Sequence, residues 1–210
     1  FGAASAVAGV ALAGLNLGAA DTIRCRLSAV GAGGGELHDT TALACGVLAA
    51  YGTWVDVLSA TVSARWLRLN LVASAPLTYA EAGRLWAGPV FQPTRNYDYG
   101  AARRTADLSQ VRVAPRSGRR FTDTGPRQRA MAFTLANLTD DEARTTVADI
   151  AMAVGSSAQV LFVPDPDSSA PNAGTMPRET YLGVMADQHE VAHRAFPIHA
   201  WPVASVRTCS

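Results

Sequence analysis

The sequence predicts a mainly β protein that contains one helix. Its 210 residues include 18 glycines and 11 prolines, which favour many turns and short strands over long helices. Several short segments alternate between apolar and polar residues, the pattern of a strand with one face in a core. Only residues 140–154 or so carry the signals of a helix. Apolar residues make up 49% of the chain and charged residues 17%, so we expect a folded globular protein.

The first ninety residues favour a β-sandwich. The stretch 64–72 alternates most clearly. Its inward residues are Leu67, Leu69 and Leu71, and its outward residues are Trp66, Arg68 and Asn70. Residues 22–29 alternate in the same way, with Cys25 on the apolar side. Further short strands are expected at 7–17, 36–41, 42–50, 54–58 and 79–87. Six to eight strands at this spacing are typical of a sandwich of two sheets.

The second half combines strands with the one helix. Strands are expected at 131–135, 160–163, 180–186 and 198–206. Thr139 is a good N-cap, and Glu142 three residues later completes a capping box. Asp140 and Asp141 suit the positive end of the helix dipole, and Gly155 ends the helix. An apolar face follows at Ala143, Val147, Ile150, Ala151 and Val154, which predicts that the helix lies on a sheet.

Charge is distributed unevenly along the chain. All 18 basic residues are arginines. Residues 95–129 hold nine arginines against three aspartates, a net charge of +6, whereas residues 130–210 hold four arginines against nine acids, a net charge of −5. These segments either neutralise each other, within one chain or between copies in a ring, or form ordinary solvated surface. Few aromatic residues lie in the basic segment, so we expect no nucleic-acid specificity and favour a hairpin or arm that contacts neighbouring subunits.

Neither the cysteines nor the first twenty residues indicate a specialised function. Cys25, Cys45 and Cys209 lack metal-ligand spacing; Cys25 is expected to be a buried thiol, and a Cys25–Cys45 disulfide stays open. Residues 1–20 are uncharged but contain Asn16 and four glycines, so we expect strand and turn and no membrane span.

One motif points to zinc. His189, Glu190 and His193 spell HExxH, which on a helix places two imidazoles and a general base around a metal, and His199 falls where a third ligand is expected. Phe196 stands where the longer pattern needs glycine, and Pro197 breaks any helix. The preceding residues also have strand character. We therefore expect a loop between two strands, no metal and no catalytic residue, with the zinc peptidase kept as a weak alternative.

Two strings of residues resemble known families. ARWLRLNLV followed by TYAEAGRLWAGP resembles the end of a discoidin or galactose-binding-like jelly roll, a resemblance that covers residues 1–92. GRLWAGPVFQPTRNYDYG, the GRRF segment at 118–121, the capped helix, VLFVPDPD and ETYLG together resemble tail proteins of siphophage-like particles, including those of prophages and gene transfer agents. These are minor tail or distal tail (baseplate hub) proteins.

The resemblance implies a structural virion protein built from two domains. Residues 1–92 would form the jelly-roll β-sandwich. Residues 95–210 would form a tail-tube-like β-sandwich with a basic arm at 95–129, and would assemble with copies of itself into a ring at the tail tip or baseplate, beside other tail proteins. The family implies no catalytic residues and no cofactor. Candidate subunit contacts are Arg103, Arg104, Arg119, Arg120, Tyr97 and Tyr99, with Asp140, Asp141 and Asp149 as acidic partners.

A glycan-binding module that contacts the host surface is the alternative function. In this hypothesis the jelly-roll loops hold a sugar against an exposed aromatic residue. The candidates are Trp54 and Trp66, although core packing is the commoner position of a tryptophan.

Overall fold

The computed structural model describes residues 3–31, 34–76, 79–155, 157–167, 169–185, 192–195 and 198–208. The chain forms two compact units. Unit 1 comprises Phe1–Phe91 and Val163–Thr180, and unit 2 comprises Gln92–Phe162 and Tyr181–Ser210. The sequence division placed all of 95–210 in the second domain, whereas residues 163–180 fold with unit 1. The chain therefore passes from unit 1 to unit 2, back to unit 1, and again to unit 2.

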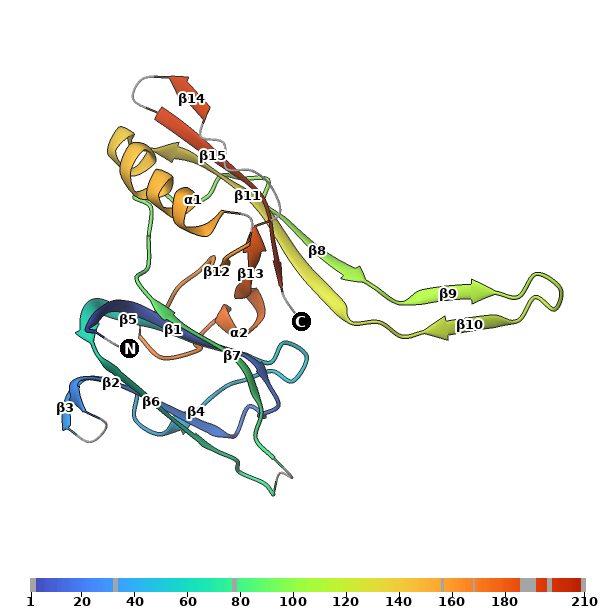
Figure 1. The fold of residues 1–210 in the computed structure, drawn as a ribbon, viewed down its shortest axis with the longest axis horizontal. Coiled ribbons are helices and arrows are strands. Elements are labelled where there is room, and N and C mark those ends of the chain that lie inside the picture. Colours follow the sequence, from blue (N-terminus) through green and yellow to red (C-terminus); the bar gives the residue numbers. More distant parts are fainter. Residues whose placement is uncertain are drawn as a thin grey trace. The chain divides into compact units, whose positions relative to one another are not determined.

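Unit 1 contains two antiparallel sheets (Figure 1). The first has the order β5-β1-β7, built from β1 (Ser5–Leu15), β5 (Thr53–Ala64) and β7 (Ala82–Gly88). In the second, β2 (Thr22–Gly31) pairs with β3 (Gly34–Asp39), β4 (Leu43–Ala44) and β6 (Trp66–Val72). Strand β5 continues beyond the expected 54–58.

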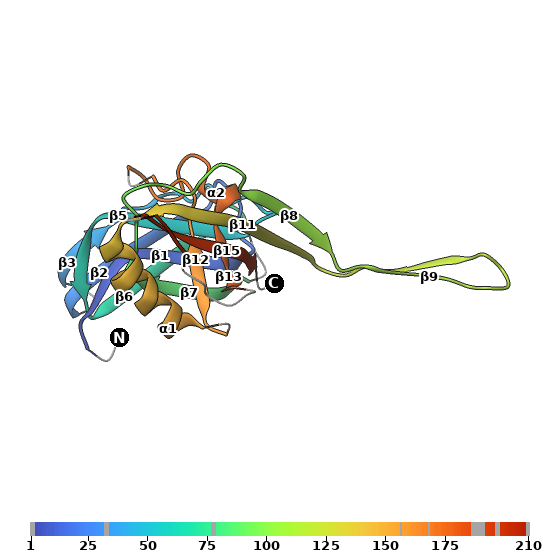
Figure 2. The ribbon, with the colours of Figure 1, turned by 90° about the horizontal axis from the view of Figure 1, so that it is seen from above.

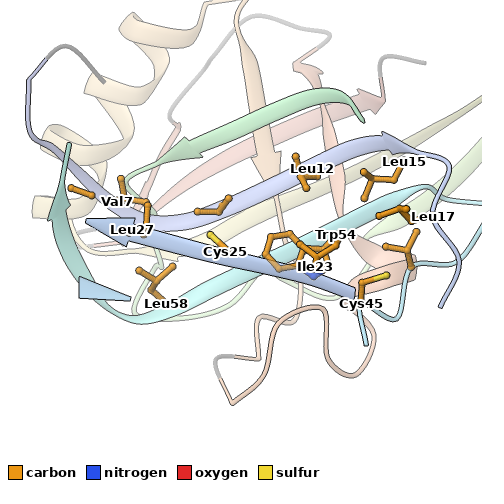
Figure 3. Close-up of a cluster of buried hydrophobic side chains, with 13 residues drawn as sticks. Val7, Leu12, Leu15, Leu17, Ile23, Cys25, Leu27, Cys45, Trp54 and Leu58 are labelled. Carbon is orange, nitrogen blue, oxygen red and sulfur yellow. The ribbon is translucent and has the colours of Figure 1, made fainter. Parts of the chain in front are cut away.

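The core of unit 1 consists of the apolar faces of both sheets (Figure 3). Leu12 of β1, Cys25 of β2 and Trp54 of β5 are fully or almost fully buried there. Leu67, Leu69 and Leu71 of β6 pack against this cluster, as the alternation of 64–72 predicts. Cys25 and Cys45 are both free thiols, so the disulfide left open by the sequence does not form.

The returning segment 163–180 is attached to unit 1 by Asn172. Its backbone N–H donates to the Val55 carbonyl, and its side-chain Nδ2 donates to the Cys45 carbonyl at 2.9 Å. The short helix α2 (Met176–Glu179), which the sequence did not predict, contacts β5, and its Met176 is fully buried. This segment therefore completes the packing of β5.

Unit 2 contains a six-stranded antiparallel sheet. Its strands are β8 (Ala102–Asp107), β11 (Arg127–Leu138), β12 (Gln159–Phe162), β13 (Tyr181–Met185), β14 (Ala192–Ala195) and β15 (Ile198–Thr208). The order is β12-β13-β15-β11-β8, and β14 also pairs with β15. An aromatic cluster supports this sheet: Phe133 and Phe162 stack with centroids 4.0 Å apart, and the Tyr97 ring meets both edge-on.

The predicted helix is confirmed. Residues 140–154 are helical, as the π-helical η1 (Glu142–Val147) followed by the α-helix α1 (Ala148–Val154). Thr139 and Glu142 form the capping box: Glu142 Oε2 accepts from the Thr139 N–H and hydroxyl, each at 2.9 Å. Ala143 and Val147 are buried, and η1 contacts β15. Gly155 follows with a φ of 52°.

The predicted fold class is confirmed at the level of a mainly β protein with antiparallel sheets and one helix longer than a single turn. The jelly-roll and tail-tube assignments stay predictions. Among the described residues, no helix is long and apolar enough to span a membrane.

Candidate interaction arm

The basic segment forms a long hairpin, which we call the arm and define as residues 102–129. At its base β8 pairs with the first half of β11, from Asp107 opposite Arg127 to Ala102 opposite Ala132. Beyond that, β9 (Gln110–Val113) pairs with β10 (Arg120–Asp123) as a separate two-stranded sheet. Figures 1 and 2 show this distal hairpin running away from the six-stranded sheet of unit 2.

A joint separates the two parts of the arm. The Leu108 N–H donates to the Pro126 carbonyl at 3.2 Å, and the Gly125 N–H donates to the Ser109 hydroxyl at 3.0 Å. A Cβ on Gly125 would lie 2.5 Å from the Leu108 carbonyl oxygen, so only glycine allows the strands to approach this closely. These contacts fix how the distal hairpin continues from the base.

The distal hairpin has no core. Residues directly opposite each other in a ladder share a face, so Val111 and Val113 lie on one face and Phe121 on the other. All residues of β8, β9 and β10 are exposed, and Phe121 is 60% exposed. Leu108 adds a further exposed apolar side chain at the joint. An isolated two-stranded hairpin is marginally stable in water, and its two outer edges offer unpaired backbone groups.

The arm is strongly basic. It holds eight arginines and two aspartates, a net charge of +6. Four of these arginines make neither an ion pair nor a side-chain hydrogen bond with any residue that the structure describes, and lie near no described carboxylate that they perturb: Arg104, Arg116, Arg119 and Arg120. Arg129 at the base differs, because its guanidinium lies over the Tyr181 ring, 4.5 Å from the centroid. Arg103 also interacts within the chain. Of the predicted contact arginines, Arg104, Arg119 and Arg120 are thus available to a partner.

The predicted acidic partners lie on the helix. Asp140 Oδ1 accepts from Arg144 Nε at 2.8 Å, one turn along the same helix, so its charge is partly neutralised within the chain. Asp141 and Asp149 are exposed. The structure does not bring any of the three against the distal hairpin of the same chain.

The two predicted contact tyrosines differ. Tyr97 belongs to the aromatic cluster with Phe133 and Phe162, so it supports the sheet. Tyr99 is fully exposed and lines a shallow hollow beside Gly100, Thr134 and Pro202. Tyr99 therefore remains a candidate contact, whereas Tyr97 has a structural role.

The structure separates the two glycan candidates. Trp54 is 1% exposed in the core of unit 1, so it cannot stack on a sugar and that assignment is wrong. Trp66 is 45% exposed on β6. The loops that the resemblance implied as the sugar site do not contain it, because Trp66 lies within a strand.

The zinc alternative requires a helix, and the structure has a strand at His193. His193 lies in strand β14, directly opposite His199 of β15, and the HExxH geometry requires a helix at this position. His189 and Glu190 lie outside the described residues. Among the residues that the structure describes, no group of three or more histidine, cysteine or acidic residues is placed to hold a metal ion.

Comparison of the chain with family models, with curated proteins and with solved structures found no match.

The sequence alone does not identify every exposed arm residue. Arg112, Arg116 and the apolar residues Leu108, Val111 and Val113 belong to no recognisable motif, although Gln110–Val113 does alternate. The alternation suggested no function because an exposed strand and a half-buried strand share the same period of two.

Proposed function

We propose that this chain is a structural subunit of a phage-like tail, located in the virion as part of a tip or baseplate ring, and that the arm binds a neighbouring copy. The observation that carries this proposal is the distal hairpin of the arm. It combines exposed apolar side chains, unpaired arginines and open strand edges, and it lacks a core of its own.

The arm has the chemistry of a surface that becomes covered. Val111, Val113 and Phe121 expose apolar area that gains free energy only when a partner removes it from water. The free edges of β9 and β10 provide backbone donors and acceptors for a partner. A solvated loop would need neither feature, because polar residues alone would keep it soluble.

Charge favours a second copy as that partner. The arm carries +6, residues 130–210 carry −5, and the whole chain carries +1. The exposed carboxylates of Asp141 and Asp149 belong to the acidic part and lie on the helix. Head-to-tail contacts of this kind between identical subunits generate a ring when the rotation closes. The resemblance to tail proteins supports the same assembly, with other tail proteins as further partners.

The test is assembly of the purified protein, measured by native mass spectrometry and light scattering at low and high salt. We expect a discrete oligomer for the unmodified chain. Reversal of two free arm charges, Arg119→Glu with Arg120→Glu, is expected to lower the oligomer population at least tenfold at low salt, because it replaces attraction by repulsion.

The matched control is Arg65→Glu with Arg84→Glu, which changes the net charge equally at two exposed arginines of unit 1. This variant is expected to assemble as the unmodified chain does. A chain that stays monomeric at all concentrations and salt conditions, or assembly that is indifferent to reversal at Arg119 and Arg120, would contradict the proposal.

A further inference from the structure

The outer face of the second sheet of unit 1 carries an unusual combination of residues, which we call the Trp66 face. Strand β6 contributes Trp66, Arg68 and Asn70 to it, strand β2 contributes Arg24 and Arg26, and strand β3 contributes Glu36. The strand register places these residues side by side. Between β6 and β2, Asn70 lies opposite Arg24 and Arg68 lies opposite Arg26. Ser28 of β2 lies between Trp66 of β6 and Glu36 of β3. All of these side chains point away from the core formed by Cys25 and Leu67.

The outer faces of the two sheets of unit 1 differ in what covers them. Val55 lies on the face of β5 opposite to Trp54, which is the outer face of its sheet. It is nevertheless fully buried, because segment 163–180 packs on β5 through Asn172 and α2. The Trp66 face carries polar and charged residues around one large aromatic ring. Trp66 is 45% exposed and lies outside the buried core cluster, so nearly half of its surface is open to a ligand. Tryptophan combines a large apolar ring with a polar N–H, which suits it to contact with a partly polar ligand.

The polar groups beside Trp66 are held in fixed positions. Arg26 donates through Nη1 to Glu36 Oε1 and through Nη2 to Asn70 Oδ1, each at 3.1 Å. The Arg26 side chain is only 15% exposed, and its Nε has no hydrogen-bond partner among the described residues. Next to this network, Arg24 Nε donates to Asp39 Oδ1 at 2.8 Å. Side chains locked in this way lose little conformational entropy when a ligand binds.

We infer that the Trp66 face binds a neutral saccharide, with one pyranose ring stacked on the Trp66 indole and its hydroxyl groups bonded to Arg68, Asn70 and Glu36. Sugar hydroxyls both donate and accept hydrogen bonds, and this face offers guanidinium and amide donors together with carboxylate and amide acceptors. Residues two apart on a strand are separated by roughly 7 Å, which matches one ring. Trp66, Arg68 and Asn70 therefore present one stacking position and two adjacent polar positions.

The composition of the face disfavours other ligand classes. Three arginines face two acids, Glu36 and Asp39, so the face lacks the strong positive potential that a nucleic-acid backbone needs. Trp66 is its one large aromatic residue, whereas a protein partner would need a broader apolar centre. A neutral, hydroxyl-rich ligand fits the balance of charges.

The experiment is binding of the intact chain to an array of immobilised neutral and sialylated glycans, with hits measured in solution by NMR titration of the corresponding methyl glycosides. We expect binding of neutral glycans with millimolar affinity for a single sugar. Trp66→Ala is expected to weaken that binding at least tenfold, and Trp66→Phe, which keeps a ring, by less. Circular dichroism verifies that each variant is folded.

Tyr79→Ala provides the matched control, because Tyr79 is an exposed aromatic residue of unit 1 that lies outside the face, and it is expected to leave binding unchanged. The inference would be overturned if no neutral glycan bound, if binding were unaffected by Trp66→Ala, or if binding were confined to polyanions and abolished by salt. A change in native mass with Trp66→Ala would instead identify the face as a contact between copies, and would also overturn it. These readouts are independent of the arm variants.

Discussion

His38 and Asp56 form a partly buried polar pair inside unit 1. His38 Nε2 lies 2.7 Å from Asp56 Oδ2, and Asp56 is 4% exposed. This hydrogen bond raises the pKa of His38 above its ordinary value, although partial burial opposes the charged form. The pair connects β3 to β5, strands of different sheets. It is thus a polar link across the sandwich.

The His38–Asp56 pair makes stability depend on pH. The pKa of His38 is higher in the folded state than in the unfolded chain, where it is near 6.5. The contribution of the pair to the free energy of unfolding is therefore fully present below pH 6.5, and it is lost as the pH rises through the folded-state pKa. His38→Gln removes the charge and leaves an amide donor. We expect the difference in melting temperature between the unmodified chain and this variant to be larger at pH 5.5 than at pH 8.5. Equal differences at the two pH values would exclude an ionic contribution, and the double variant with Asp56→Asn serves as the reference.

Cys25 lies on β2, in the same sheet as the β3 strand that carries His38, but burial disfavours ionisation of its thiol. It is fully buried, and burial raises the pKa of its thiol well above the ordinary value. Its backbone N–H donates to the Thr40 hydroxyl at 2.9 Å. The Cys25 thiol therefore packs as a small apolar side chain of the core.

At the scale of the element, the helix depends on one carboxylate. Glu142 Oε1 accepts from the Thr94 N–H at 2.7 Å and from the Thr94 hydroxyl at 2.8 Å, while Oε2 accepts both donors of Thr139. Partial burial favours the neutral acid, but these four hydrogen bonds outweigh it and lower the pKa to about 2. The capping box thereby also fixes the connector before the arm.

Glu142→Gln tests this arrangement. Only one of the two amide atoms accepts hydrogen bonds, so the variant loses half of the contacts and all of the charge, and we expect a loss of about 1 kcal/mol in the free energy of unfolding. Because the folded pKa is lowered, the contribution of Glu142 is present above pH 4.5 and disappears as the pH falls toward 2. Denaturant titrations at pH 7 and pH 3 measure both effects. Asp149→Asn, at an exposed helical acid, is the control, and an equal loss in that variant would count against the cap.

The arm shows how one element assembles from unlike parts. Its base belongs to the sheet of unit 2 and is anchored by Arg129 over Tyr181, whereas its distal hairpin depends on β9–β10 pairing alone. Gly125 joins the two parts at the position where a Cβ would meet the Leu108 carbonyl. The arm is therefore held by the sheet of unit 2 at its base, whereas its distal end has only the β9–β10 ladder.

At the scale of the whole molecule, each unit is built from two separate segments of the chain. Segment 163–180 returns to unit 1, where Asn172 binds the carbonyls of Val55 and Cys45 and Met176 becomes fully buried. Unit 1 is consequently incomplete in residues 1–91 alone. Its stability depends on residues that follow most of unit 2 in the sequence.

Fragments test this dependence. We expect residues 1–91 alone to expose the outer side of β5 around Val55, to bind a hydrophobic dye and to melt at a lower temperature than residues 1–91 joined to 163–180 by a flexible glycine–serine linker. The physical reason is the apolar area that α2 removes from water. Thermal melts followed by circular dichroism make the comparison, and identical melts for the two fragments would show that the returning segment contributes no stability.

The sequence by itself determined the local features of this protein. The alternation of 64–72 assigned Leu67 to the core and Trp66 to the surface, and Thr139 with Glu142 located the helix, because periodicity and capping depend on residues a few positions apart. The uneven charge along the chain likewise identifies the basic segment.

Only the tertiary structure decided the features that depend on distant residues. It buried Trp54, paired His38 with Asp56 and returned 163–180 to unit 1 through Asn172. It also distinguished the arm arginines that interact within the chain, Arg103 and Arg129, from those that do not. It also placed Arg26 between Glu36 and Asn70, which lie 10 and 44 residues away along the chain. Such contacts follow from strand pairing and sheet packing, and no local pattern of residues encodes which strands become neighbours.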